Sequence, residues 1–300
     1  MTAASSDLAR PTYDLVTDAF DFPVWEGPPL RTILICSHPR SGSTLLGEAM
    51  TFAGGLGCPL EYFHEGFRPT MASRWRAPDM HALVSAVWRH RTDPNGILSV
   101  KLFWRDLIQL ALALEPSRFA DVAGLAPSVM SADTYRSLAA LMAACFPNAE
   151  FVYLSRLDRV RQAVSGFTAM QTGRWRNIPG LPERDGYPTR ASYEFDGIAA
   201  LANHAEACHR HWANLFSASQ ISPLTLNYEE LARDYAGVTR RVLDALGSAA
   251  PAPAPRMLRQ VDSAQEALVL RYLRERQTKT GDGAAAVAGS GRSDGSAPGL

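Results

Sequence analysis

The chain has 300 residues with 30 basic and 30 acidic side chains, so its formal net charge is zero. This balance gives no electrostatic reason to expect binding to nucleic acid or to an anionic membrane surface. No apolar run reaches the roughly 18 residues that a membrane-spanning helix needs, so we expect no membrane insertion. The first thirty residues are acidic and lack a basic start followed by an apolar core, which argues against a secretory signal and predicts a cytoplasmic protein. Four cysteines without paired spacing agree with free thiols in a reducing compartment.

Short apolar runs alternate with helical patterns from residue 31 onward. In chain order, the pattern predicts a strand at 32–36, a helix at 43–53, a strand at 97–103, a helix at 138–145, a strand at 151–154, helices at 158–171 and 195–216, a strand at 224–226 and a helix at 238–246. Two stretches with weak periodicity, 62–96 and 174–194, are interpreted as long loops or lids. Short, continuously apolar strands separated by helices predict an α/β fold with a central parallel sheet and helices on both faces.

The composition also suggests how the chain is divided. We expect an N-terminal extension at 1–30, one domain at 31–280 and a tail at 281–300. Fourteen of the twenty tail residues are Gly, Ala or Ser, which predicts disorder there.

A short polar loop, Pro39-Arg40-Ser41-Gly42-Ser43-Thr44, separates the first predicted strand from the first predicted helix. A strand, a tight Ser/Gly turn and a helix start can direct successive backbone N–H groups, and the positive end of the helix dipole, at a phosphate. In the nucleotide triphosphatase pattern GxxxxGK[ST], a lysine grips the β- and γ-phosphates, and Ser43 stands at that position here. The loop therefore suits a phosphate-like ligand other than a triphosphate. An ordinary helix cap is the alternative interpretation.

A second group of polar residues follows the strand at 151–154. Arg156 lies at its carboxyl end and Ser165 lies two turns into the next helix. Ligands of open parallel sheets bind beyond the carboxyl ends of the strands, so Arg156 is expected on the same rim as the loop at 39–44. An arginine fork and a serine hydroxyl suit a phosphate, and two phosphate sites on one rim fit a nucleotide with phosphates at both ends of its ribose. A solvated strand-end arginine and a neutral helix serine are the alternative.

The long predicted helix at 195–216 carries His204 and Cys208 four residues apart. Such a pair can bind zinc, but the sequence shows no further ligand, so no metal site is predicted.

Seven motifs together resemble a bacterial family of sulfotransferases that use 3′-phosphoadenosine-5′-phosphosulfate (PAPS), the family typified by trehalose 2-sulfotransferase. They occur in family order over residues 31–276: Pro39–Thr44, Gly57–Phe63, Lys101–Trp104, Arg156 with Ser165, Gln171-Thr172 with Trp175-Arg176, Asn227–Leu231 and Arg259–Asp262. The resemblance implies a P-loop-like three-layer fold and transfer of a sulfonate to a hydroxyl of a carbohydrate or similar small molecule. It also implies that no metal is required, and it suggests a homodimer.

The resemblance assigns roles to individual residues. Glu61 matches the glutamate that acts as general base towards the acceptor hydroxyl. Arg40 occupies the position of a loop lysine in other sulfotransferases, so it is the candidate cation at the transferred group. Donor binding is assigned to Arg40, Ser41, Gly42, Ser43, Thr44, Arg156 and Ser165, and substrate binding to Pro39, Pro59, Leu60, Glu61, Tyr62 and Phe63.

Two alternatives remain open from the sequence. A small-molecule kinase of the P-loop class would need magnesium and a lysine after Gly42, where this chain has Ser43. A catalytically silent nucleotide-binding protein would keep the loop without turnover. One further expectation concerns Lys101, which interrupts an apolar strand and therefore needs an acidic partner or access to the rim.

Overall fold

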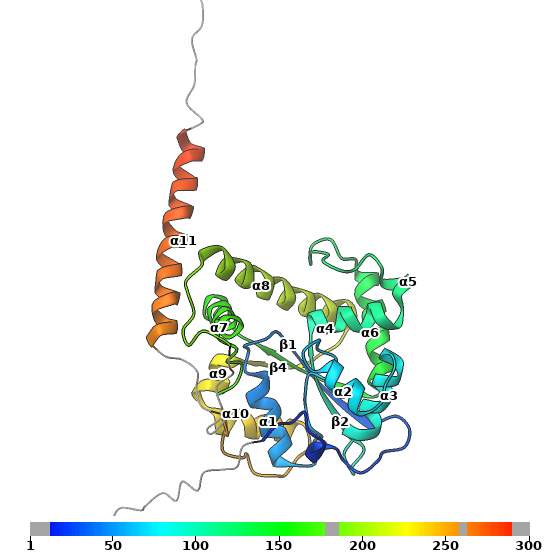
Figure 1. Cartoon of the computed structure of the whole chain (residues 1–300). Coiled ribbons are helices and arrows are strands. Elements are labelled where there is room, and N and C mark those ends of the chain that lie inside the picture. Colours follow the sequence, from blue (N-terminus) through cyan, green and yellow to red (C-terminus); the bar gives the residue numbers. More distant parts are fainter. Residues whose placement is uncertain (1–12, 178–185, 258–262, 290–300) are drawn as a thin grey trace, which may run out of the picture.

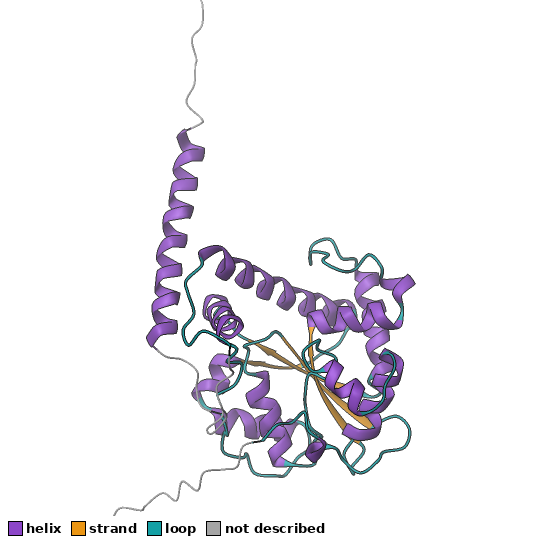
Figure 2. Ribbon diagram, in the orientation of Figure 1, coloured by secondary structure: helices purple, strands orange, loops and turns teal. Residues whose placement is uncertain are grey.

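The computed structural model describes residues 13–177, 186–257 and 263–289. Its centre is a four-stranded sheet, all parallel, in the order β2-β1-β3-β4. The strands are β1 (Arg31–Ser37), β2 (Ile97–Phe103), β3 (Ala149–Ser155) and β4 (Leu224–Asn227). Helices surround this sheet in Figure 2, so the predicted α/β fold with a covered parallel sheet is confirmed.

The helices fall into three groups around the sheet. The first group follows β1 and β4: α1 (Ser43–Ala53), α9 (Tyr228–Arg233) and α10 (Tyr235–Ala245). The second surrounds β2: α2 (Arg68–Arg74), α3 (Met80–Arg91), α4 (Trp104–Leu114), α5 (Pro116–Phe119) and α6 (Ala132–Cys145). The third comprises α7 (Arg159–Thr172), α8 (Phe195–Ala218) and α11 (Ser263–Gly289), and a short 3-10 helix, η1 (Asp18–Phe20), precedes the sheet.

Strand β1 packs on both faces because its side chains alternate between two cores. Ile33 and Ile35 join the core formed with α1, α9 and α10, whereas Leu34 and Cys36 join the larger core that includes α3, α4, α6 and α8. All four side chains are fully buried. A strand covered on both faces is continuously apolar, which explains why the run at 32–36 was recognisable from sequence.

The stretch 62–96 was interpreted as a long loop, and this prediction is wrong because α2 and α3 lie within it. Asp79 caps α3 by accepting a hydrogen bond from the Ala82 N–H, at 2.8 Å. Met80, Leu83, Val84 and Val87 then form its buried face. The spacing i, i+3, i+4, i+7 after an N-cap aspartate is a helix signal, but the intervening charged and polar residues weakened its periodicity. The other stretch, 174–194, has no helix or strand in the residues described, and 178–185 lie outside them.

The two ends of the described chain pack differently. Near the N-terminus Leu15 is buried in the main core, and Arg91 of α3 donates a hydrogen bond to its carbonyl at 3.0 Å. At the other end α11 packs on α7, where Arg161 pairs with Glu266 at 2.6 Å, and then extends beyond the body of the molecule (Figure 1). Helix α11 continues to Gly289, so residues 281–289 of the tail predicted to be disordered are helical. Residues 290–300 lie outside the described part, and the domain limits stay predictions. None of the described helices is long and apolar enough to cross a membrane.

Candidate active site

The loop Pro39–Thr44, here called the donor loop, joins β1 to α1. Gly42 is the N-cap residue of α1 with φ 83°, a left-handed conformation that favours glycine, and Arg40 also has a positive φ of 66°. Helix α1 receives no capping hydrogen bond from a side chain, unlike α6, α7 and α10. The N–H groups of its first turn have no intrahelical acceptors, so the end of α1 can bind an anion. A non-glycine residue in a rarely populated conformation at such a loop is typical of a functional site.

Two arginines meet at this loop. Arg156, just beyond β3, stacks on the Tyr228 ring at 4.4 Å and donates a hydrogen bond to the Arg40 carbonyl at 3.1 Å. The Arg40 side chain in turn donates to the Ser165 hydroxyl at 3.0 Å and to the Trp175 carbonyl at 2.6 Å. Burial and the charge of Arg156 lower the pKa of Arg40 to about 10. An anion bound between the two guanidinium groups would relieve their repulsion, so the site suits a phosphate-bearing ligand.

Residues from α7 and α9 hold the donor loop in place. The Gln162 amide, which is buried, donates to the Pro39 carbonyl at 3.0 Å and to the Ser41 hydroxyl at 2.8 Å. The Glu229 carboxylate accepts hydrogen bonds from the N–H groups of Leu157 and Asp158, which fixes the turn after β3. The loop is therefore preorganised by its neighbours before any ligand binds.

Glu61 lies next to the donor loop because its segment pairs briefly with β2. Leu60 forms an isolated parallel bridge with Val100 and accepts a hydrogen bond from the Lys101 N–H at 3.0 Å. This pairing places the Glu61 carboxylate 2.7 Å from the Lys101 ammonium, which also donates to the Thr44 hydroxyl at 3.2 Å. Glu61 is 7% exposed and Lys101 is 2% exposed. The acidic partner expected for Lys101 is present, and one buried lysine connects the donor loop to the candidate base.

A second carboxyl group, Asp106 in the first turn of α4, lies close to this pair. It is 1% exposed, and neither of its carboxyl oxygens has a hydrogen-bond partner among the residues described. Burial, with a further contribution from the charge of Glu61, raises the pKa of Asp106 to about 7. The site therefore combines an ion-paired carboxylate with a carboxyl group that holds its proton near neutral pH.

This raised pKa predicts a pH dependence of stability. Because the pKa is higher in the folded state than the ordinary value of 3.8, the contribution of Asp106 is fully present below about pH 4 and is lost as the pH rises through about 7. At about 1.4 kcal/mol per pKa unit, the loss amounts to as much as about 4 kcal/mol. Urea unfolding between pH 4 and 8 should show a flatter profile for Asp106→Asn than for the wild-type chain. Parallel profiles would contradict the burial of an ionisable Asp106.

The sequence of this chain is similar to those of known sulfotransferases. The family model described as Stf0 sulphotransferase matches residues 32–275. The chain belongs to the Stf0 sulphotransferase family. A trehalose 2-sulfotransferase of Mycobacterium tuberculosis (strain ATCC 35801 / TMC 107 / Erdman) is 30% identical over 273 residues, which cover 82% of this chain and 96% of that protein. Another of Mycolicibacterium smegmatis (strain ATCC 700084 / mc(2)155) is 30% identical over 275 residues, covering 81% of this chain and 95% of that protein.

Membership of the Stf0 family confirms the resemblance drawn from the motifs and makes this chain a sulfotransferase-family enzyme. The structure brings the predicted donor residues together: Arg40, Ser165 and Arg156 are linked by hydrogen bonds around the donor loop. Thr44 and Glu61 meet through Lys101. The role of each of these residues stays a prediction.

Some predicted contact residues lie in the core. Tyr62 and Phe63 are at most 1% exposed; the Tyr62 hydroxyl donates to the Cys58 carbonyl, and Phe63 packs on Phe146. In this structure their side chains anchor the segment that carries Glu61. The motif Arg259–Asp262 falls outside the described residues.

Sequence reasoning missed Gln162 and Asp106. Gln162 lies on the buried face of α7 between Ala163 and the capping residue Asp158, and Asp106 lies on the buried face of α4. For Gln162 the available signal was a polar residue on the apolar face of the helix predicted at 158–171, whereas no helix was predicted around Asp106.

Proposed function

We propose that this Stf0 sulfotransferase moves the sulfonate of PAPS to a hydroxyl of a carbohydrate, with Glu61 as the general base. The observation that carries the proposal is the buried Lys101 bridge, which places a carboxylate beside the donor loop through contacts of 2.7 and 3.2 Å. A base is useful only within reach of the acceptor hydroxyl at the reacting group, and the position of Glu61 beside the donor loop supports this role.

The donor loop fits PAPS by its donors and its shape. The first-turn N–H groups of α1 and the Arg40 guanidinium suit the 5′-phosphosulfate, and Arg156 suits the 3′-phosphate. A side chain at Gly42 would place its Cβ 2.9 Å from the Tyr228 ring, in a backbone conformation that is strained for other residues, so the turn depends on glycine. The bound donor supplies an activated sulfonate with a nucleotide leaving group. No residue of this loop replaces the triphosphate-gripping lysine, which supports the sulfonate donor over the kinase alternative.

In the proposed transfer each of these residues has a separate role. Glu61 accepts the proton of the acceptor hydroxyl as that oxygen attacks sulfur, and Lys101 orients the Glu61 side chain. Arg40 and the α1 N–H groups stabilise the charge that develops on the bridging oxygen as the bond to the leaving phosphate breaks. Contacts from Arg156 and Gln162 hold the donor loop before a ligand binds, which reduces the reorganisation that the reaction requires.

The names of two relatives support a sugar as the acceptor. Both curated relatives are named trehalose 2-sulfotransferase, and alignment with them covers more than four fifths of this chain. We therefore propose trehalose, or a related sugar, as the acceptor to test first.

Arg156→Ala should remove recognition of the 3′-phosphate. Loss of a charge-assisted hydrogen bond corresponds to about 1.5–3 kcal/mol in affinity. Arg156 also donates to the Arg40 carbonyl, so the substitution loosens the donor loop and weakens every nucleotide to some degree. Calorimetry with adenosine 3′,5′-bisphosphate and adenosine 5′-monophosphate separates the two effects, because only the preference between them reports the 3′-phosphate.

The matched control for this measurement is Arg136→Ala, which removes an exposed arginine of α6 that pairs with Asp133. It should leave the nucleotide preference unchanged. An Arg156→Ala variant that keeps the wild-type preference would remove Arg156 from the donor site.

A further inference from the structure

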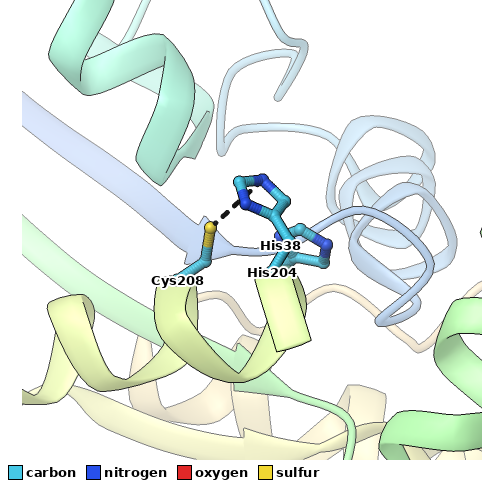
Figure 3. A group of neighbouring side chains, drawn as sticks. All are labelled: His38, His204 and Cys208. Atoms are coloured by element: carbon cyan, nitrogen blue, oxygen red, sulfur yellow. Dashed lines mark hydrogen bonds between the residues drawn. The ribbon is translucent and has the colours of Figure 1, made fainter. Parts of the chain in front are cut away.

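Three potential metal ligands from two separate elements meet beside the donor loop. His38 directly follows β1 and precedes Pro39, whereas His204 and Cys208 lie one turn apart on α8. Figure 3 shows the side chains of His38, His204 and Cys208 close together, with a dashed line for the contact between Cys208 and His204. One ligand atom from each residue lies within 4.8 Å of the other two. The i, i+4 pair visible in the sequence therefore gains a third ligand from the fold.

The distances suit a tetrahedral ion. Cys208 Sγ lies 3.6 Å from His204 Nε2. Zn–S and Zn–N bonds of about 2.3 and 2.0 Å place a sulfur and a nitrogen ligand about 3.5 Å apart in tetrahedral geometry. The His38 nitrogen lies within 4.8 Å of the other two ligand atoms, so it needs to approach them by up to about 1.5 Å.

We propose that His38, His204 and Cys208 bind one zinc ion. Two imidazoles and a thiolate are a borderline-soft ligand set that suits zinc over magnesium or calcium. His204 is exposed and Cys208 is buried, so the site can be reached from solvent at one side and is closed at the other. The ion would tie the residue before the donor loop to α8. Neither Glu61 nor Lys101 belongs to this cluster, so the inference does not depend on the proposed transfer reaction.

The protonation states favour binding at two of the ligands. Burial lowers the pKa of His38 to about 3, and it also lowers the pKa of His204, so both imidazoles are neutral at pH 7. Burial raises the pKa of Cys208 to about 12, so zinc must displace the thiol proton. Binding should therefore release about one proton per ion, and that proton comes from Cys208.

The positive charges nearest the cluster are neutralised by partners. Arg105 pairs with Glu65 at 2.9 Å, and Arg159 pairs with Glu206 at 2.9 Å. The neighbouring His209 is neutral as well, because burial lowers its pKa to about 3, and its Nδ1 is hydrogen-bonded to the Tyr153 hydroxyl. Repulsion of a cation at the cluster is thereby reduced.

The experiment uses the full chain, stripped with a chelator and titrated with cobalt and with zinc. Cobalt should give a thiolate-to-metal charge-transfer band at a stoichiometry of about one, and zinc should abolish it. Calorimetry of zinc binding in buffers of different ionisation enthalpy should show release of about one proton. Cys208→Ser should lose the band and the proton release, and His204→Ala should weaken zinc binding by about tenfold or more.

Two control variants match these substitutions. Cys145→Ser removes another buried free thiol, and His81→Ala removes an exposed histidine of α3. Both should bind cobalt as the wild-type chain does. A wild-type chain without the thiolate band, or a Cys208→Ser variant that keeps it, would overturn the proposal, and circular dichroism of each variant excludes misfolding as the cause.

Discussion

Glu61→Gln should lower kcat by about 10²–10⁴-fold, the usual contribution of a positioned general base. Glutamine keeps the size of the side chain and can still hydrogen-bond the acceptor hydroxyl, so KM should change little. The affinity for PAPS should stay near the wild-type value, because Glu61 contacts Lys101 and reaches the donor loop through that lysine. Steady-state kinetics together with a PAPS dissociation constant separate lost chemistry from lost binding.

The pH profile gives a second readout of the same substitution. The acid limb of the wild-type pH–rate profile reports the general base, so this limb should be absent from Glu61→Gln. Glu65→Gln is the matched control, since Glu65 lies four residues on but pairs with Arg105 at the surface. A Glu61→Gln enzyme with near wild-type turnover would rule out Glu61 as the base.

Lys101→Met should destabilise the fold by about 3–5 kcal/mol, because it leaves the buried carboxylate of Glu61 without its counter-charge. Methionine retains most of the length and apolar surface of lysine, so the loss reports the ion pair rather than a cavity. Urea unfolding at pH 7 measures the change. The only other lysine of the chain, Lys279, lies on α11 with 52% of its side chain exposed, and Lys279→Met should change stability by no more than about 0.5 kcal/mol.

The double variant Lys101→Met/Glu61→Gln isolates the pair. Once the carboxylate is replaced by an amide, no uncompensated charge remains, and most of the lost stability should return. A double variant as unstable as the sum of the two single variants would show that the two groups do not interact energetically. Lys101→Met should also lower kcat, because both the orientation of Glu61 and the contact to Thr44 are lost.

The strands of the sheet could be predicted from sequence because the apolar pattern of each strand is local. Strand β2 is mainly apolar although Lys101 interrupts it, and its predicted limits, 97–103, agree with Ile97–Phe103. The loop before α1 was recognisable because a glycine in the left-handed conformation is needed at Gly42. Helix α3 was missed because polar residues outside its buried face, Arg89 and His90 among them, weaken the apolar periodicity.

The parts of the site that sequence could not predict depend on contacts between distant segments. The pairing of Leu60 with Val100 sets Glu61 beside Lys101, forty residues apart in the chain, and no local pattern specifies it. The approach of His38 to α8 likewise joins residues more than 160 positions apart. The motifs indicated which residues belong to the site. How these residues lie relative to one another could be seen only in the folded structure.

One assay tests directly whether this chain transfers a sulfonate from PAPS to a sugar hydroxyl. Purified protein is incubated with sulfur-labelled PAPS and trehalose in magnesium-free buffer, and the products are separated and identified by mass spectrometry. We expect a sulfated sugar and adenosine 3′,5′-bisphosphate in equal amounts, with Glu61→Gln forming both at least about 100 times more slowly. A folded chain that binds PAPS but forms no sulfated product with trehalose or with other sugars would contradict the account.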